Sequence, residues 1–371
     1  MIECKPDGRP PTVLMTADCV GGVWSYAAGL CRSLPDTRFI LATMGPHPVQ
    51  AQRDAIRELE NVTFVESDYR LEWMAGGDLD FPASRHWLLD LIAQYEVDVV
   101  HVNGYAQGQL GFDRPAVVVA HSDVLSWWRA VHKCAAPPEW DEYRKNVIAG
   151  LASASRIIAP TAAVMHDLEH HYLPLAGAAS VIPNGVDATA FRITAKQPFV
   201  LAAGRLWDAA KNLAALSTAA PGLSWPIAIA GATEHPEGGT VRLANARLLG
   251  PLTPAEMARA LASAGIFAAP ARYEPFGLAI LEAAAAGCPL VLGDIPSLRE
   301  NWNGAAIFVD PEHPVELHAA LAMLIANPEE RRVMATAARS RARSFTMDRM
   351  AGAYSALYRE MMHNSAVLET A

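Results

Sequence analysis

The sequence predicts an α/β protein of two domains, each built on a parallel β-sheet covered by helices on both faces. Short apolar runs alternate with longer amphipathic stretches along the chain, as expected for βαβ units. The chain has 371 residues, 51% of them hydrophobic, which is enough material for about two domains with buried cores. A turn-rich segment at 182–187, with the sequence IPNGVD, interrupts the alternation near the middle and predicts a linker at about 184–198.

Twelve short apolar runs are predicted to be strands, six on each side of this linker. The runs in the first half are 13–15, 39–42, 97–102, 116–120, 157–159 and 181–182. Those in the second half are 199–202, 227–230, 247–249, 266–269, 289–292 and 307–309. Helix-like stretches between them cover 24–33, 87–95, 143–154, 254–262, 278–286 and 315–326.

Two helix starts carry clear capping signals. Thr253 and Glu256 form a capping box around a Pro, and Asn327 precedes a Pro and two acidic residues in the same way. The tail beyond 331 is predicted to form two helices that divide near 345–348.

Charge and cysteine content exclude several classes of protein. The net charge is −9, and the first 190 residues carry all of it, with 14 Lys+Arg against 23 Asp+Glu. An acidic chain is a poor candidate for nucleic-acid binding. Five widely spaced cysteines without a C-x-x-C predict reduced thiols in a cytoplasmic protein rather than a disulfide framework or a zinc site. The N-terminus lacks an apolar signal core, and no apolar run reaches the roughly 18 residues of a membrane span.

A glycine pair follows the first predicted strand. Gly21 and Gly22 lie between that strand and a predicted helix, so the backbone there can approach a ligand closely and the helix N-terminus can face an anion. The pair is also compatible with a plain tight turn. The sequence has neither a G-x-G-x-x-G nor a P-loop motif, which disfavours ordinary dinucleotide and P-loop sites.

Two cations follow the strand at 199–202. Arg205 and Lys211 lie six residues apart in a strand-to-helix loop, where a guanidinium fork and a mobile ammonium can converge on a diphosphate. Solvated surface charges are the alternative interpretation.

The most informative segment, 270–282, follows the strand at 266–269. Gly277 lies where a loop becomes a helix, so amides there can face phosphate oxygens. Glu274 precedes the helix and Glu282 lies about 7.5 Å along its axis from Gly277. One carboxylate can therefore bind a sugar and the other a ribose, although either residue taken singly could be an ordinary surface Glu.

Together these motifs resemble the retaining glycosyltransferases of family 4, which have the GT-B fold. The resemblance rests on Glu274-x7-Glu282 within EPFGLAILEAAAAGCPLV, on the GR…KN segment with Arg205 and Lys211, on the IPNGVD linker and on the GGVW loop. It is most specific over 199–311 and looser over 1–180. It implies two Rossmann-like doubly wound domains facing a central cleft: an acceptor-side domain at 1–190, a nucleotide-sugar domain at 191–349, and a C-terminal helix at about 350–371 that packs back on the first domain.

The resemblance also implies roles for individual residues. Arg205 and Lys211 neutralise the diphosphate, Glu274 binds donor-sugar hydroxyls and Glu282 binds the ribose. Backbone amides near Phe276, Gly277 and Leu278 assist. In the first domain, Gly21 and Gly22 close over the phosphates, and His121 matches a histidine that contacts the donor sugar.

No metal or other cofactor is expected. Asp78 and Asp80 form a D-x-D, but they are predicted to lie in a Gly-rich loop and are assigned to turn formation. The acceptor is open between a small molecule, a glycan and a lipid-linked molecule. The aromatic residues Trp24, Trp73 and Trp127 suit either a sugar ring or an ordinary core. The acidic first half disfavours an anionic membrane lipid and leaves peripheral membrane contact at most.

Three alternatives to a glycosyltransferase stay open at this point. A glycoside phosphorylase or a nucleotide-sugar epimerase can be built on the same fold, and a non-catalytic nucleotide-sugar-binding protein can retain it. The nucleobase, the sugar and the linkage are not predicted.

Overall fold

The computed structural model describes residues 9–110, 112–172, 178–234 and 238–369. The chain forms two compact units. The first contains residues up to Ser126, Cys134–Gly185 and the segment from Met347 onward, and the second contains Trp127–Lys133 and Val186–Thr346. Cys4 and the other N-terminal residues in which the sequence shows no apolar signal core lie outside the described residues. The other four cysteines are free thiols.

The first unit is built on a seven-stranded sheet of order β3-β2-β1-β4-β5-β6-β7, in which every pairing is parallel. This is the Rossmann type of doubly wound order, which reverses direction between β1 and β4. The strands are β1 (Thr12–Asp18), β2 (Arg38–Met44), β3 (Val62–Glu66), β4 (Val99–Val102), β5 (Ala116–Val119), β6 (Arg156–Ala159) and β7 (Ala178–Val181).

Helices cover both faces of this sheet, because successive strand side chains point to opposite faces and both sets are apolar. On β1, Val13 and Met15 face one core layer, whereas Leu14 faces the other. The helices are α1 (Gly22–Ser33), α2 (Gln50–Arg57), α3 (Gly77–Tyr95), α5 (Asp141–Ser153), α6 (Ala162–Tyr172) and α13 (Met347–Glu369). The helix α4 (Val124–His132) begins in the first unit, and its residues from Trp127 onward belong to the second. Short 3-10 helices lie at η1 (Ala106–Leu110), η2 (Pro138–Trp140) and η3 (Ala188–Ala190), the last in the second unit.

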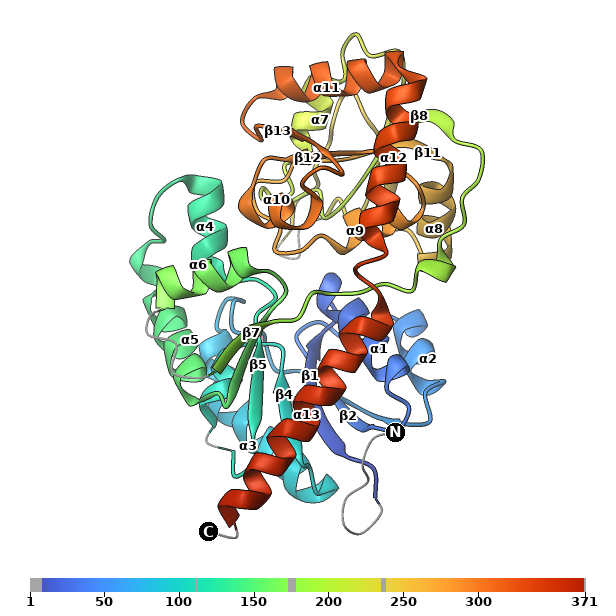
Figure 1. Cartoon of the computed structure of the whole chain (residues 1–371). Coiled ribbons are helices and arrows are strands. Elements are labelled where there is room, and N and C mark those ends of the chain that lie inside the picture. Colours follow the sequence, from blue (N-terminus) through green and yellow to red (C-terminus); the bar gives the residue numbers. More distant parts are fainter. Residues whose placement is uncertain (1–8, 111, 173–177, 235–237, 370–371) are drawn as a thin grey trace. The chain divides into compact units, whose positions relative to one another are not determined.

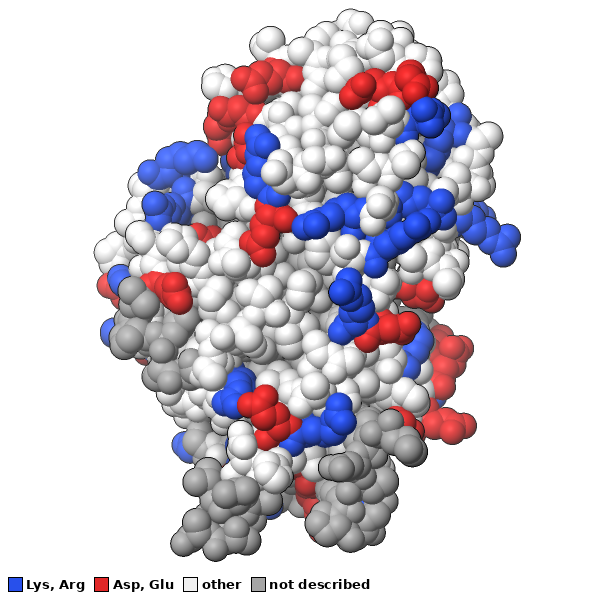
Figure 2. All heavy atoms as spheres, viewed as in Figure 1, with Lys and Arg blue, Asp and Glu red and all other residues white. Residues whose placement is uncertain are grey.

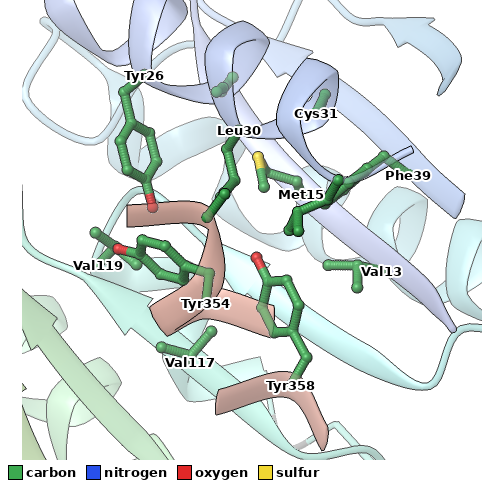
Figure 3. Packing of buried hydrophobic residues seen from close by; sticks show 14 of the residues in the cluster. Val13, Met15, Tyr26, Leu30, Cys31, Phe39, Val117, Val119, Tyr354 and Tyr358 are labelled. Carbon is green, nitrogen blue, oxygen red and sulfur yellow. The ribbon is translucent and has the colours of Figure 1, made fainter. Parts of the chain in front are cut away.

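The C-terminal helix α13 belongs to the first unit and packs against α1 (Figure 1). Tyr354 and Tyr358 are fully buried in the same core layer as α1 and alternate residues of β1, β4 and β5. The rings of Tyr354 and Tyr26 meet edge to face at 5.8 Å between centroids, and Figure 3 shows both beside Leu30. The last helix of the chain is therefore part of the first unit's core.

The second unit is built on a six-stranded parallel sheet of order β10-β9-β8-β11-β12-β13. Its order reverses between β8 and β11. The strands are β8 (Gln197–Ala203), β9 (Ile227–Ala230), β10 (Arg247–Gly250), β11 (Ala264–Ala269), β12 (Leu290–Gly293) and β13 (Ile307–Val309). The helices are α7 (Ala214–Ala219), α8 (Pro254–Ser263), α9 (Leu278–Ala285), α10 (Pro296–Trp302), α11 (Pro314–Ala326) and α12 (Pro328–Ala342).

The predicted strands and helices are present, and the structure adds α2, α4, α6, α7 and α10, which lie outside the predicted helical stretches. Three further differences have local causes. The edge strand β3 was not predicted, since its residues are only half-buried and lack a continuous apolar run. The helix expected at 87–95 begins at Gly77, which places Asp78 and Asp80 in its first turn rather than in a loop. Asn327 does not cap α12; its side chain donates instead to Met323 O at the end of α11, at 2.7 Å. The capping box of Thr253 and Glu256 forms as predicted.

In the part of the chain that the structure describes, no helix is long and apolar enough to span a bilayer.

Replacing Tyr354 by Ala should lower the free energy of unfolding by about 3–5 kcal/mol, because it removes a fully buried ring and leaves a cavity between α13 and α1. Urea denaturation followed by circular dichroism measures this change. The matched variant Tyr354→Phe keeps the ring and should cost at most about 1.5 kcal/mol. Equal stability of Tyr354→Ala and wild type would contradict the packing of α13.

Candidate functional site

The loop after β8 is held tightly against the neighbouring strand. Gly204 N donates to Ala230 O at 3.0 Å, and Gly231 has a positive φ of 142°. A Cβ on Gly231 would lie 1.8 Å from Gly204 O, so only glycine fits there. This close approach fixes the backbone immediately before Arg205.

Arg205 is paired with a buried acid that sequence reasoning did not single out. Its Nη2 donates to Asp208 Oδ2 at 2.7 Å, and its guanidinium carbon lies 5.1 Å from the centre of the Trp207 ring. Asp208 Oδ1 accepts from Ala210 N at 3.0 Å and from Trp127 Nε1 at 3.1 Å. Burial acts to raise the pKa of Asp208, but the charges of Arg205 and Lys211 outweigh it and lower that pKa.

Lys211 and Glu274 form a short ion pair between two loops. Lys211 Nζ lies 2.6 Å from Glu274 Oε2, and both side chains are about four-fifths buried. The next residue, Asn212, has a left-handed φ of 54° and donates through Nδ2 to Pro270 O at 2.9 Å and to Pro311 O at 2.7 Å. Asn212 therefore ties the Lys211 loop to the Glu274 loop, and the structure brings Arg205, Lys211 and Glu274 into one charged cluster.

The segment before α9 is fixed by its backbone. Ser297 Oγ donates to Glu274 O at 2.6 Å, and Gly277 caps α9 with a left-handed φ of 88°. The side chain of Phe276 is buried and meets Phe345 edge to face, so only the backbone of Phe276 is available to a ligand. No side chain caps α9, so its first amides, including that of Leu278, are oriented for an anion.

Glu282 lies in the next turn of α9 and, unlike Glu274, has no charged partner in the part of the chain that the structure describes. Its side chain is half-buried among apolar neighbours, and its carboxylate accepts no hydrogen bond from the described residues. Desolvation raises its pKa to about 7. A half-buried carboxylate without a donor is suited to bind hydroxyl groups of a ligand.

In the first unit, Gly21 and Gly22 are exposed at the start of α1. Gly21 has a left-handed φ of 92°, and no side chain caps the helix. One turn further along the same helix, Tyr26 meets the His121 ring edge to face at 4.6 Å. The helix N-terminus and His121 are thus linked through α1.

His121 follows β5 and is held by a second residue that the sequence analysis did not assign to the site. Its Nε2 lies 2.8 Å from Asn103 Oδ1, and Asn103 follows β4, the neighbouring strand. Burial lowers the pKa of His121 to about 4, so the ring is neutral at physiological pH. The sequence feature that could have identified Asn103 is its position, because it is a polar residue directly after a buried strand.

The two carboxylates of the D-x-D, Asp78 and Asp80, lie in the first turn of α3. Asp80 Oδ2 accepts from Arg70 N at 2.9 Å, an arrangement that closes the loop before α3. Within the described ranges, no cluster of three or more His, Cys, Asp or Glu side chains could hold a metal ion.

The aromatic residues divide between core and surface. Trp24 is buried and packs edge to face on Phe64, whereas Trp73 is 39% exposed. Trp127 is half-buried and engaged with Asp208. Trp24 is therefore a core residue, and Trp73 has the exposure that contact with a sugar ring requires.

Replacing Glu282 by Gln should stabilise the free protein increasingly as the pH rises. Ionisation of Glu282 costs folding free energy that is absent below its ordinary pKa of 4.5 and complete above about 7. The difference in unfolding free energy between variant and wild type should therefore grow by roughly 2–3 kcal/mol from pH 5 to pH 8.

Denaturation curves at the two pH values measure this difference. The control Glu329→Gln should show no such gain, because a hydrogen bond from Arg332 lowers the pKa of that exposed carboxylate. If the unfolding free energies of Glu282→Gln and wild type changed equally between the two pH values, Glu282 would be an ordinary solvated carboxylate and the prediction would be wrong.

Two family models match the chain. Residues 20–190 match the model described as Glycosyltransferase Family 4, and residues 197–327 match Glycosyl transferases group 1. The chain is 32% identical over 202 residues to the glycogen synthase of Mycobacterium tuberculosis, a match covering 50% of this chain and 49% of that protein. The chain therefore aligns with about half the length of this relative.

Solved structures share the fold. Sucrose-phosphate synthase from Thermosynechococcus elongatus superposes with a TM-score of 0.79 at 18% identity, over 96% of this chain and all of that chain. Anabaena HepE in complex with UDP and glucose superposes with a TM-score of 0.72 at 16% identity, over 94% of this chain and all of that chain. With these neighbours, the two parallel-sheet units are those of the GT-B fold. The chain belongs to the group 1 glycosyltransferases of family 4.

Proposed function

We propose that this glycosyltransferase moves a sugar from a nucleotide-diphosphate sugar to a hydroxyl group of an acceptor, with retention of anomeric configuration and without a metal ion. The observation that carries the proposal is the cluster of Arg205, Lys211 and Glu274, with the unpartnered Glu282 on the adjoining helix. A ligand with two phosphates, a ribose and a sugar supplies a partner for each of these groups.

Charge development explains the two cations. When the bond between the sugar and the diphosphate breaks, negative charge grows on the leaving phosphate. Arg205 and Lys211 stabilise that charge most strongly in the transition state, because the loop already holds them in place. This is the work that a divalent cation performs in metal-dependent transfer.

The ion pair between Lys211 and Glu274 gives the free site a defined resting state. In the free protein, Lys211 Nζ lies 2.6 Å from Glu274 Oε2. The ammonium group has three N–H donors, so it can donate to an incoming diphosphate and to Glu274 at the same time. The Glu274 carboxylate then accepts hydrogen bonds from hydroxyls of the donor sugar. Retention of configuration fits departure and attack on the same face of the sugar, assisted by the phosphate.

The neighbours' names support a carbohydrate acceptor and a uridine nucleotide. Glycogen synthase and sucrose-phosphate synthase are named for sugar products, and HepE was solved with UDP and glucose. We propose a neutral or soluble acceptor rather than an anionic lipid, since the first 190 residues carry the whole net charge of −9. We further propose a cytoplasmic location, in which the free thiols stay reduced.

Lys211→Ala and Glu282→Ala should each lower kcat/KM for transfer by about 100-fold or more, because each removes a group that binds the donor or its leaving phosphate. A discontinuous assay of nucleoside diphosphate release in the presence of acceptor measures this loss. Lys145→Ala, on the exposed surface of α5, should retain wild-type activity. Wild-type activity in both site variants would refute the site assignment.

The same assay separates the rival enzymes. Turnover of the donor without acceptor and without release of nucleoside diphosphate would indicate an epimerase. Sugar transfer that requires inorganic phosphate rather than a nucleotide would indicate a phosphorylase. Tight donor binding with no turnover across acceptors would favour a binding protein.

One of UDP-, GDP- or ADP-glucose should raise the unfolding temperature of the wild-type chain by several degrees, because a ligand at about 100 times its Kd stabilises the folded state by about 2.7 kcal/mol. Differential scanning fluorimetry measures the shift. We expect UDP-glucose to give the largest shift and Glu282→Ala to abolish it. No shift with any of the three nucleotide sugars would argue against a nucleotide-sugar site.

A further inference from the structure

A buried chain of hydrogen bonds runs through the core of the first unit, from the C-terminal helix to His121. It begins at Tyr358 of α13, whose hydroxyl lies 2.6 Å from His101 Nδ1 on β4. His101 is fully buried, and its Nε2 lies 3.2 Å from Asn103 Oδ1 and 3.2 Å from Tyr26 Oη. Figure 3 shows Tyr26, Tyr354 and Tyr358 converging on this part of the core.

The amide of Asn103 has only one consistent orientation. Its Nδ2 donates to the backbone carbonyl of Thr16 at 2.6 Å, and its backbone N–H donates to Thr16 Oγ1 at 3.0 Å. A carbonyl can only accept, so the NH₂ group must face Thr16 and Oδ1 must face the two histidines. Oδ1 lies 2.8 Å from His121 Nε2, which must therefore carry a proton.

We propose that Asn103 is a positioning residue that fixes His121 in the Nε2–H tautomer, so that Nδ1 accepts a hydrogen bond from a hydroxyl of the substrate sugar. The role of the hydroxyl rests on the proposed function, whereas the tautomer rests on this network alone. Nδ1 is the acceptor that remains on the ring, and it has no hydrogen-bond partner among the described residues. His121 is partly exposed.

The surroundings keep the His121 ring neutral. A charged imidazolium carries a proton on both nitrogens and could not accept a hydrogen bond at Nδ1. Desolvation lowers the pKa of His121 to about 4. The titratable groups that face the His121 ring are neutral as well. Tyr26 of α1 packs on the ring. The pKa of His101 is lowered to about 3, mainly by burial and to a lesser extent by the nearby His121. Burial also raises the pKa of Tyr354. The carboxylate two residues on, Asp123, accepts from Tyr172 Oη at 2.8 Å and from Ser126 N at 2.9 Å.

The tautomer can be read directly from the full chain labelled with ¹⁵N-histidine. Long-range ¹H–¹⁵N correlation spectra distinguish a protonated from an unprotonated ring nitrogen, and the loss of signals in His121→Gln assigns the residue. We expect a neutral His121 with the proton on Nε2 in the wild type at pH 7. A proton on Nδ1, or a ring that stays unchanged in Asn103→Leu, would overturn the proposal.

Asn103→Asp supplies a second, independent test. A carboxylate still accepts from Nε2 but favours the charged imidazolium, so the pH at which His121 protonates should rise by about one unit or more. The acidic limb of the pH profile of kcat/KM should move to higher pH by the same amount. A merely structural role of Asn103 would not produce this shift. The control Asn146→Asp makes the same charge change at a half-buried position on α5 and should leave both titrations unchanged. A pH titration of His121 that does not move in Asn103→Asp would contradict the proposal.

The kinetic constants of Asn103→Leu show whether the hydroxyl that donates to His121 Nδ1 belongs to the donor sugar or to the acceptor. In Asn103→Leu, kcat should fall by about tenfold or more, since the ring no longer holds its acceptor in place. A rise in the donor KM assigns the hydroxyl to the donor sugar, and a rise in the acceptor KM assigns it to the acceptor. An Nε2–H tautomer in a chain that transfers no sugar would contradict the proposed function and leave the tautomer assignment standing. Full transfer activity in Asn103→Leu would refute the positioning role alone.

Discussion

Two cations can lie in one partly buried loop only when acidic side chains offset their charge, and the charged cluster of the second unit depends on this constraint. Asp208 compensates Arg205, and Glu274 compensates Lys211 across to the next loop. Without these partners, desolvation of the cations would cost several kcal/mol each. The backbone is arranged to bring the charges together, through the close approach of Gly231 to Gly204 O and the left-handed turn at Asn212. The same pairing leaves the cations available to a ligand whose phosphates carry more charge than a carboxylate.

The two sheets explain why residues far apart in sequence meet at these positions. In each sheet the order of strands reverses once, between β1 and β4 in the first and between β8 and β11 in the second. Loops at the carboxyl ends of such strands diverge to opposite faces and leave room for a ligand. Lys211 and Glu274 follow β8 and β11, while Thr16 lies on β1 and Asn103 and His121 follow β4 and β5. In the second unit, Lys211 and Glu274 therefore lie at the switch point of the sheet; in the first unit, Thr16 and Asn103 do so, and His121 follows the next strand, β5.

Sequence patterns predicted the sheets well because parallel strands are buried on both faces and read as continuous apolar runs. They missed β3, which lies at an edge, and the start of α3, where Gly76 and Gly77 concealed a helix. The resemblance to family 4 grouped Arg205, Lys211, Glu274 and Glu282, but it did not predict which of them pair, because ion pairs depend on loops that approach only in the folded chain. Asp208 and Asn103 were visible as polar residues near strand ends, yet nothing local distinguished them. The Arg side chains of the second unit also serve its fold: on α12, where Arg residues gather on the surface (Figure 2), Arg331 and Arg341 donate to the last carbonyls of α11 and α10.

The central claim is that the charged cluster of the second unit binds the diphosphate of a nucleotide sugar. A crystal structure of the full chain with UDP tests it most directly. The account predicts phosphate oxygens within hydrogen-bond distance of the Arg205 guanidinium and Lys211 Nζ, with the ribose hydroxyls on Glu282 and the first amides of α9 facing the diphosphate. A well-ordered nucleotide bound elsewhere, with Lys211 still paired only to Glu274 and Glu282 still without a partner, would contradict it.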